Sequence, residues 1–351
     1  MAWTAAEGDE EAPRLRTSGT GHRRQVVISI ALAALLGAGA WFLIGQAANY
    51  SKLEDAVRRA NPWWLVAAVL SVSIGYLGYA LLYKTLAGVD GGPRPSLPVT
   101  LRVTIAVFGA SVIATSAGRL GSEYWAMRKM NERPAWAWSR VLGLNTGMWA
   151  ALAAMAWAGA ALMLIGVGRP APIWLELTWF LLVVVCLPPA LFLSSPAHER
   201  WQQDAGGKVR RTFAAALRGL VLLRDVAKER RLLAAGATGS LLLWGSDLLA
   251  VWLALRAFGV DIGYGQLVIG YATGYASTML PLPAGGAGGV DAASTYALTL
   301  VGVPLGPALL ATLVQRVCTY WMPLGVALVG ARSVRRLPDD LAHVPGAVGR
   351  G

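Results

Sequence analysis

Six ionisable side chains lie inside apolar stretches of the sequence, where they could bind or carry a charged group. They are Arg119, Glu123, Arg140, Asp247, Asp291 and Arg316. Each costs about 2.5 to 3.5 kcal/mol at the centre of a membrane span, so each requires a structural or functional reason. A guanidinium offers a planar fork of donors that matches phosphate oxygens, and a buried carboxylate can pair with it or carry a proton. These residue types therefore point to recognition of an anionic group such as a phosphate.

Arg316 falls near the middle of the last apolar stretch. Its polar neighbours are Thr312, Gln315, Thr319 and Tyr320. In this position Arg316 could hold a phosphate that crosses the membrane. The structural interpretation is an ion pair with Asp247 or Asp291, and Asp247, in the middle of its own stretch, is interpreted mainly as such a partner. The two roles of Arg316 are compatible if the pair opens when a substrate enters.

Asp291 follows a glycine-rich break in the sequence. The run Pro281–Gly289 contains Gly285, Gly286, Gly288 and Gly289, and a continuous helix would be costly there. Asp291 then stands in the expected first turn of a half-helix, where the helix dipole favours a carboxylate. Plain capping is therefore the structural interpretation of Asp291. Without this carboxylate, the exposed N–H groups of the same turn would suit a phosphate.

Glu123 occupies the matching position in an earlier apolar stretch. Arg119 stands four residues before it, so a local ion pair on one helix face is the structural interpretation. The functional interpretation makes Glu123 and Asp291 gates or proton carriers on the two sides of a path, because a desolvated carboxylate can hold a proton near neutral pH. Arg140, near the start of its own stretch, is expected to reach the cytoplasmic surface with its long side chain.

The composition indicates which class of protein must position these residues. Of 351 residues, 56% are hydrophobic and only 14% are charged, whereas soluble globular chains carry about 25% charged residues. The apolar residues gather in stretches of about 20, long enough to cross a bilayer core of about 30 Å. We therefore expect a polytopic membrane protein and not a soluble enzyme. The stretches predicted to cross fully are 25–46, 62–83, 137–166, 172–194, 232–257 and 306–330.

Two further apolar stretches are interrupted. Stretch 99–130 breaks at Gly118–Glu123, and stretch 265–302 breaks at Pro281–Gly289. If both dip into the membrane and return to the same side, most Lys and Arg residues fall in cytoplasmic segments; if both cross, this bias disappears. The sequence therefore predicts two re-entrant hairpins. Topology then accounts for the net charge of +12, and nucleic acid is not expected as a partner.

The resulting prediction is an all-α polytopic fold with about six full transmembrane helices and two re-entrant helical hairpins, in two inverted-topology halves. The halves are 25–166 and 172–330, and each reads span, span, hairpin, span. Broken helices in corresponding positions of two halves point to a transport site at the midplane. Broken backbone is tolerated at that depth only inside protein or around a water-filled cavity, so the hairpins are expected to line an interior.

The polar segments complete this domain organisation. Segment 1–24 is expected to be a disordered cytoplasmic N-terminus, and the apolar run after it is too long for a cleaved signal peptide and reads as a retained anchor. The cytoplasmic loop 195–231 contains apolar residues at helical spacing over Lys208–Asp225, which predicts an amphipathic helix on the membrane surface. Segment 333–351 is expected to be a cytoplasmic tail.

Signatures of enzymes and cofactor sites do not occur in the sequence. The two cysteines lie in apolar stretches and the three histidines have no ligand spacing, so neither a disulfide framework nor a metal site is expected. The sequence has no GxxxxGK phosphate loop, no HExxH and no GxSxG, so ATP-driven export and metal-assisted catalysis lack their residues. We therefore expect no cofactor and no enzymatic activity.

Several runs of the sequence resemble one protein family. They are LPLPAGGAGGVD at 280–291, Gly302–Pro304, Arg316–Gly325 with Tyr320, and Gly118–Lys129 with the later Arg140. Over about residues 25–332 the chain resembles the transmembrane, or flippase-like, domain of lysylphosphatidylglycerol synthases. It departs from that pattern in having Asp291 where Glu is expected. The resemblance implies a bundle with two re-entrant elements, associated with moving an anionic or aminoacylated phospholipid, or a polyprenyl-linked precursor, between leaflets.

The resemblance also implies a limit, because aminoacyl-lipid synthases carry a soluble catalytic domain after this module. The tail that ends at Gly351 is too short for one, so lipid synthesis by this chain alone is not expected. The predicted function is translocation of such lipids across the plasma membrane without ATP hydrolysis, with both termini cytoplasmic and anionic lipid headgroups as partners. The residues expected on the path are Arg316, Glu123, Asp291, Arg119, Arg140, Asp247, Tyr320, Gly285, Gly286, Gly288 and Gly289.

Two alternatives remain open from the sequence. One is an accessory membrane subunit that presents lipid to, or anchors, a separately encoded lipid-modifying transferase. The other is a membrane-embedded transferase that uses Glu123 or Asp291 as its base.

Overall fold

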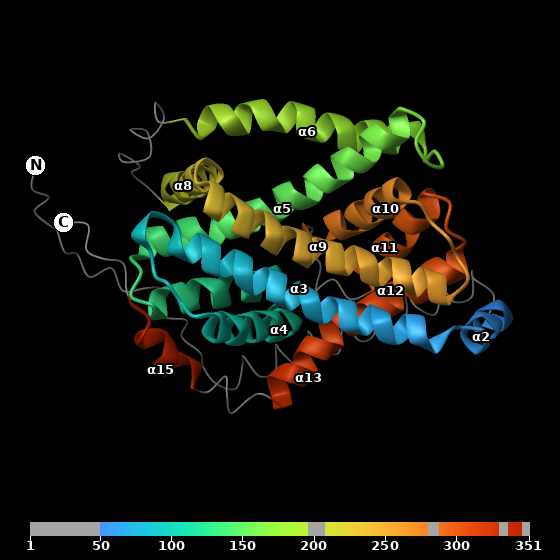
Figure 1. The fold of residues 1–351 in the computed structure, drawn as a ribbon, viewed down its shortest axis with the longest axis horizontal. Coiled ribbons are helices and arrows are strands. Elements are labelled where there is room, and N and C mark those ends of the chain that lie inside the picture. Colours follow the sequence, from blue (N-terminus) through green and yellow to red (C-terminus); the bar gives the residue numbers. More distant parts are fainter. Residues whose placement is uncertain (1–49, 196–207, 280–287, 330–335, 346–351) are drawn as a thin grey trace, which may run out of the picture.

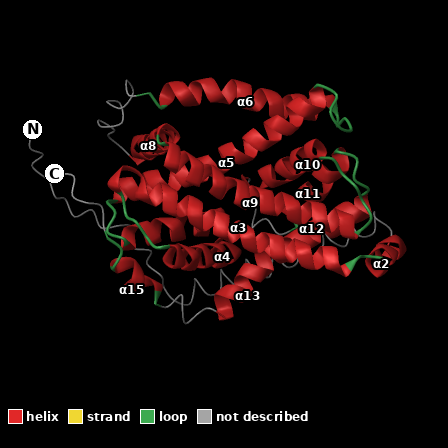
Figure 2. Cartoon of the chain, in the orientation of Figure 1, coloured by secondary structure: helices red, strands yellow, loops and turns green. Residues whose placement is uncertain are grey.

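Helices account for the regular structure of the part of the chain that is described. The computed structural model describes residues 50–195, 208–279, 288–329 and 336–345. Over these ranges Figure 2 shows helices joined by loops and no strand, which confirms the all-α prediction. The helices are α2 (Tyr50–Arg58), α3 (Pro62–Gly88), η1 (Val89–Gly91), α4 (Leu97–Lys129), α5 (Pro134–Leu164), α6 (Ile173–Leu193), α8 (Lys208–Lys228), α9 (Arg230–Ala257), α10 (Tyr264–Ala276), η3 (Ser277–Met279), α11 (Gly289–Leu300), α12 (Leu305–Arg316), the π-helix η5 (Val317–Trp321), α13 (Met322–Val329) and α15 (Leu337–Ala342).

Four of the helices, α3, α5, α6 and α9, are long and apolar enough to cross a membrane. They confirm four predicted spans as long helices: 62–83, 137–166, 172–194 and 232–257. The predicted span 25–46 lies outside the described residues. The predicted span 306–330 is divided, because α12 ends at Arg316 and a π-helix separates it from α13.

Helices α3 and α9 pack against each other in antiparallel directions at the centre of the bundle (Figure 1). The backbone N–H of Asn61, which caps the start of α3, donates to the carbonyl of Ala257 at the end of α9, at 3.2 Å. Further along, a Cβ atom on Gly78 would come within 2.6 Å of the Gly239 carbonyl oxygen. Small residues permit such close backbone approach between membrane helices. Since each helix belongs to one predicted half, the two halves share one core.

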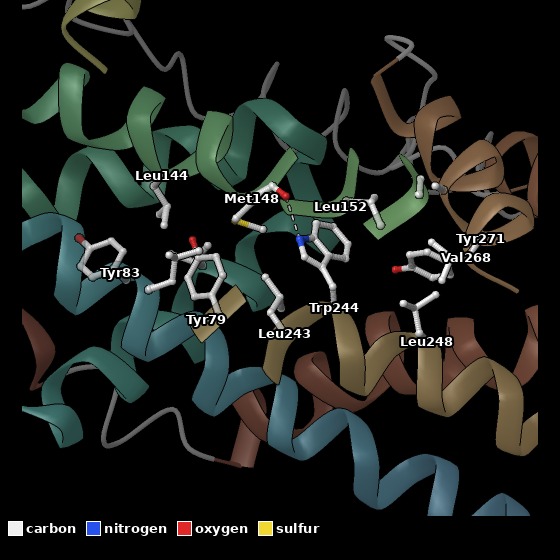
Figure 3. Close-up of a cluster of buried hydrophobic side chains, with 14 of the residues drawn as sticks. Tyr79, Tyr83, Leu144, Met148, Leu152, Leu243, Trp244, Leu248, Val268 and Tyr271 are labelled. Atoms are coloured by element: carbon white, nitrogen blue, oxygen red, sulfur yellow. Dashed lines mark hydrogen bonds between the residues drawn. The ribbon is translucent and has the colours of Figure 1, made fainter. Parts of the chain in front are cut away.

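Trp244 of α9 anchors α5 to this central pair. Its indole N–H donates to the carbonyl of Met148 at 2.8 Å, which satisfies the one polar atom of a buried ring. Figure 3 shows Trp244 between Tyr79 of α3 and Tyr271 of α10. These two tyrosines carry hydroxyl groups into an otherwise apolar interior. The core therefore holds polar atoms that must be satisfied by neighbouring side chains.

The two ends of α4 lie close together. The backbone of Gly92, just before α4, packs against the Arg140 guanidinium, because a Cβ atom on Gly92 would lie 2.3 Å from a terminal nitrogen of Arg140. Glu132, just after α4, forms an ion pair with the same guanidinium at 3.0 Å. A straight helix of 33 residues would separate its ends by about 50 Å. α4 therefore folds back on itself, as the predicted hairpin 99–130 requires.

The position of the reversal in α4 differs from the prediction. Gly118–Glu123, the expected break, is helical, with Arg119 and Glu123 paired one turn apart. The hydroxyl of Tyr79 donates to Glu123, and its ring lies 5.0 Å from that of Phe108. A straight helix would place Phe108 about 22 Å from Glu123 along its axis. The chain thus reverses between these two residues, and the predicted break is wrong because glycine lowers helix stability without forbidding a helix.

Helices α10 and α11 form the second hairpin. At its open end the side-chain amide of Gln266 donates to the carbonyl of Val301 at 2.8 Å. Nearer the closed end, a Cβ atom on Gly274 would lie 2.6 Å from the Cα of Ser294. With 13 and 12 residues, each helix is about 20 Å long and too short to cross a bilayer core. The helical hairpin predicted over 265–302 is confirmed, although residues 280–287 of its break lie outside the described residues.

The predicted amphipathic helix over Lys208–Asp225 is present as α8, Lys208–Lys228. Figure 1 views α8 nearly along its axis, whereas α3, α5 and α9 run across the picture, so α8 lies across one end of the bundle. Its apolar face packs on α5, where a Cβ atom on Gly143 would come within 3.2 Å of the Gly219 carbonyl oxygen. α8 is therefore part of the bundle and not only a surface helix.

Candidate functional site

The start of α11 places a carboxylate between a backbone cap and an arginine. The Gly288 N–H donates to Oδ2 of Asp291 at 3.0 Å, and Nε of Arg316 donates to Oδ1 at 2.6 Å. Gly288 has a φ of +81°, a conformation that favours glycine. The helix cap and the ion pair, which the sequence offered as separate roles for Asp291, are therefore made by the same side chain.

A small polar cavity, partly open to the outside, borders this ion pair. Its walls come from α9, α10, α11, α12 and the π-helix that follows α12. Thr312, Gln315 and Thr319, the described side chains among the polar neighbours of Arg316 expected from the sequence, line the cavity with it. Tyr271 and Tyr275 of α10 and Ser294 of α11 supply hydroxyl groups. A cavity with an arginine and several hydroxyl donors suits an oxyanion.

The π-helix begins directly after Arg316. A π-helix inserts an extra residue per turn and breaks the regular hydrogen-bond ladder, and such segments occur frequently at functional sites. Here the hydroxyl of Tyr76 on α3 donates to the carbonyl of Cys318 at 3.2 Å. The backbone of Tyr320 lies in the same π-helix, and its side chain is outside the described residues. The π-helix spans only five consecutive residues, but no pattern in the sequence predicted it.

Glu123 lies in a second polar cluster, built on α4. Its side chain is fully buried and is held by the Tyr79 hydroxyl, by Nδ2 of Asn145 at 2.7 Å and by Nε of Arg119 at 3.4 Å. Arg119 also donates to Oδ1 of Asn145. The predicted pair of Arg119 and Glu123 is confirmed. Sequence reasoning missed Tyr79 and Asn145, although Asn145 is a polar residue inside an apolar stretch and could have been noticed.

Tyr275 joins the two clusters. The Arg119 guanidinium donates to the Tyr275 hydroxyl, and Arg316 acts electrostatically on the same hydroxyl. The Tyr275 ring is held between Trp149 of α5, at 5.1 Å, and Trp244 of α9, at 5.0 Å. An arginine of the first hairpin therefore contacts a residue that lines the cavity of the second. The two hairpins meet inside the bundle.

Asp247 lies behind the cavity wall, in the middle of α9. Its carboxylate accepts a hydrogen bond from the Tyr271 hydroxyl at 3.0 Å. Tyr271 in turn accepts from the side-chain amide of Gln315. The sequence suggested Asp247 or Asp291 as the acidic partner of Arg316, with Asp247 favoured, and the carboxylate at 2.6 Å from Arg316 belongs to Asp291. Asp247 is therefore linked through two neutral side chains to α12, the helix that carries Arg316.

Arg140 was expected to reach the cytoplasmic surface with its guanidinium, and this is wrong. Its side chain is 2% exposed and makes an ion pair with Glu132 and a hydrogen bond of 2.8 Å to the Leu86 carbonyl. Its guanidinium lies over the Trp136 ring. These partners offset part of the free-energy cost of burying the charge. Arg140 joins the two ends of α4 and is absent from the cavity lining.

The glycines of the predicted site are divided between two regions. Gly285 and Gly286 lie outside the described residues, whereas Gly288 and Gly289 form the start of α11. Across the described ranges, His, Cys, Asp and Glu residues do not gather in threes. The arrangement instead offers donors to an anion.

Comparison with known proteins identifies relatives over nearly the whole chain. The model of a family described as "Lysylphosphatidylglycerol synthase TM region" matches residues 26–327. A UPF0104 membrane protein of Methanothermobacter thermautotrophicus is 25% identical over 357 residues, which cover 91% of this chain and 99% of that protein. A UPF0104 membrane protein of Pyrococcus horikoshii is 28% identical over 106 residues, or 30% of this chain and 32% of that protein.

Proposed function

Because the chain belongs to the family of lysylphosphatidylglycerol synthase transmembrane regions, we propose that it moves the headgroup of a membrane lipid across the bilayer without hydrolysing ATP. The lipid is an anionic or aminoacylated phospholipid, or a polyprenyl-linked lipid. Each of these substrates has a phosphate that must leave water to cross the membrane. The chain is a multi-pass membrane protein, and we propose the plasma membrane as its location, with both termini cytoplasmic.

The observation that carries the proposal is the ion pair of Asp291 and Arg316 beside a polar cavity. The pair joins a hairpin too short to cross the bilayer to a span that a π-helix interrupts. A lipid phosphate is an oxyanion like the Asp291 carboxylate, so it can replace that carboxylate on Arg316 at little electrostatic cost. The acyl or prenyl chains stay in the lipid while the headgroup passes through the cavity.

The proposed translocation does not require the site to form or break covalent bonds in the lipid. Asp291 and Glu123, the two candidate bases, each form an ion pair with an arginine and accept a hydrogen bond from at least one further donor. Both carboxylates are therefore already engaged in contacts that stabilise the helical bundle. We therefore propose a translocator and not a transferase. Membrane lipids are its proposed partners, gathered at the end of the bundle where the basic helix α8 lies.

The test is headgroup accessibility in liposomes that contain the purified protein. Labelled phosphatidylglycerol, phosphatidylethanolamine and a polyprenyl phosphate are compared for the native chain, Arg316→Ala and a matched control, Arg256→Ala. Arg256 forms its ion pair with Asp261 at the exposed end of α9, at 2.9 Å. We expect transfer of at least one lipid, about tenfold to a hundredfold slower in Arg316→Ala, since a hydrogen bond to a charged group contributes about 1.5 to 3 kcal/mol.

Three results would contradict the proposal. Equal transfer by Arg316→Ala and the native chain would remove Arg316 from the path. No transfer by folded native protein, with an enzyme that co-purifies, would favour an accessory subunit of a lipid-modifying transferase. A modified lipid detected by mass spectrometry would favour a transferase.

A further inference from the structure

Asp247, whose side chain is half-buried, differs from the four buried acidic side chains of the described helical bundle in having neither an arginine nor a helix N-terminus beside it. Three of these side chains form an ion pair with a guanidinium: Glu123 with Arg119 at 3.4 Å, Glu132 with Arg140 at 3.0 Å, and Asp291 with Arg316 at 2.6 Å. A fourth, Glu176, lies in the first turn of α6, where a backbone N–H binds it at 2.8 Å and the helix dipole favours it. Asp247 lies in the middle of α9 and its hydrogen bond comes from the neutral Tyr271.

The groups that face Asp247 from the helices around it are neutral at physiological pH. They are Tyr76 of α3, Tyr271 and Tyr275 of α10, and Cys318 of the π-helix. Within the described ranges the carboxylate has no ion pair. The undescribed apolar stretches 26–46 and 280–287 contain no Lys, Arg or His, so they cannot provide a counter-charge either. An ionised carboxylate in this place is costly, and protonation removes the cost.

We propose that Asp247 is a proton-binding site whose occupancy is coupled to the cavity. In the ionised state its carboxylate accepts the hydrogen bond of Tyr271. On protonation, the Tyr271 hydroxyl, which lines the cavity, passes its proton to the carboxylate and takes one from a hydronium ion of the cavity water, which becomes water. The protonated Asp247 then donates to the Tyr271 oxygen. Because Tyr271 also accepts from Gln315, the residue next to Arg316, the change reaches the cavity wall.

The coupling rests on the proposed function, because it requires an anionic headgroup in the cavity. The headgroup brings a negative charge close to Asp247, and an ionised Asp247 would repel it in a region of low dielectric. Anion binding therefore favours the protonated side chain, and by linkage the bound proton favours the anion to the same extent. A headgroup and a proton would cross together, so a proton gradient could drive transfer without ATP.

The proton site is tested first without any lipid. Infrared difference spectra of the full chain in detergent are recorded as the pH is changed, and the C=O band of a protonated carboxyl is followed. The variants are Asp247→Asn and a matched control, Asp261→Asn, which alters the exposed carboxylate beyond the end of the same helix. We expect a titrating band that Asp247→Asn loses and Asp261→Asn keeps. The same band in Asp247→Asn, or no band in the native chain, would overturn the proposal.

A second variant covers the case in which Asp247→Asn does not fold. Tyr271→Phe keeps the ring in the aromatic cluster and removes the hydrogen bond that stabilises the ionised carboxylate. We expect the carboxyl band of Tyr271→Phe to persist to a higher pH than that of the native chain. An unchanged titration would contradict the assignment of the band to Asp247.

The coupling is tested in liposomes with an internal pH indicator. Phosphatidylglycerol is the probe, because its phosphodiester does not itself take up a proton near neutral pH. We expect phosphatidylglycerol transfer to acidify the compartment that receives the lipid, and Asp247→Asn to lose this acidification. Transfer without a pH change would overturn the coupling and leave the proposed function intact. A titrating Asp247 in a protein that moves no lipid would support the proton site and contradict the proposed function.

Discussion

The two hairpins carry a carboxylate at corresponding positions, and its surroundings differ. Glu123 of α4 is sealed among Tyr79, Asn145 and Arg119, with no exposed surface. Asp291 of α11 is held by Arg316 and a backbone N–H, and it borders a small polar cavity that is partly open to the outside. The Glu123 site is filled by neighbouring side chains, whereas the Asp291 site borders a cavity that a ligand could enter.

The location of the arginine explains this difference. In the first hairpin the arginine stands one turn from its carboxylate on the same helix, and the next helix supplies the neutral Asn145. In the second hairpin the next helix supplies Arg316, 25 residues after Asp291. A pair within one helix moves as a unit, whereas a pair between two helices breaks when either helix moves. The second hairpin is therefore the one suited to opening, and the first is suited to holding the bundle.

The largest expected effect on stability comes from removing the side chain that joins the two ends of α4, the first hairpin. Arg140→Ala leaves Glu132 buried without a counter-charge and frees both ends of α4. We expect the free energy of unfolding to fall by about 3 to 5 kcal/mol, the usual cost of removing one partner of a buried ion pair. Thermal unfolding in detergent measures the change, with the exposed Arg94→Ala as control. An effect no larger than that of the control would mean that Arg140 does not anchor the hairpin.

A smaller effect separates the two carboxylates. Glu123→Gln should lower the free energy of unfolding by about 2 to 3 kcal/mol, because hydrogen bonds to a charged acceptor are lost in a sealed site. Asp291→Asn should cost about 1 kcal/mol, since water in the cavity can bind Arg316. Unfolding in denaturant compares the two variants. A larger loss of unfolding free energy in Asp291→Asn would mean that the second hairpin, and not the first, holds the bundle together.

The smallest expected effect is the coupling between Asp291 and Arg316. A double-mutant cycle with Asp291→Ala and Arg316→Ala should give an interaction energy of about 1 kcal/mol, near the low end for residues in contact, because the pair is partly open to the cavity. The double variant should regain part of its stability without regaining headgroup transfer. If it regained transfer as well, Arg316 would act only as a structural partner of Asp291.

Much of the fold could be predicted because its signals are local. Long apolar stretches predicted α3, α5, α6 and α9, and the Pro and Gly run predicted the hairpin of α10 and α11. The break in α4 was placed wrongly at Gly118–Glu123, because a reversal depends on the packing around it and not only on glycine content. The π-helix at Val317–Trp321 was not predicted for the same reason.

The residues of the candidate site also fall into those that the sequence predicted and those that it did not. Charged side chains in apolar stretches stand out by their cost, so Arg316, Asp291 and Glu123 were found. Tyr275 and Asn145 were missed, because neutral polar side chains cost less to bury and are common in membrane helices. They nevertheless connect the charged groups into one network.

The sequence by itself determined that this chain is a helical membrane protein with two interrupted apolar stretches, each of which carries a carboxylate. Length, apolarity and the distribution of Lys and Arg are summed along the chain and do not depend on which helix lies beside which. Only the tertiary structure decided that Arg316 pairs with Asp291, that Arg140 joins the ends of α4, and that Asp247 has no counter-charge among the described residues. Ion pairs act over a few ångströms, and residues far apart in sequence come within that distance only when the helices have packed.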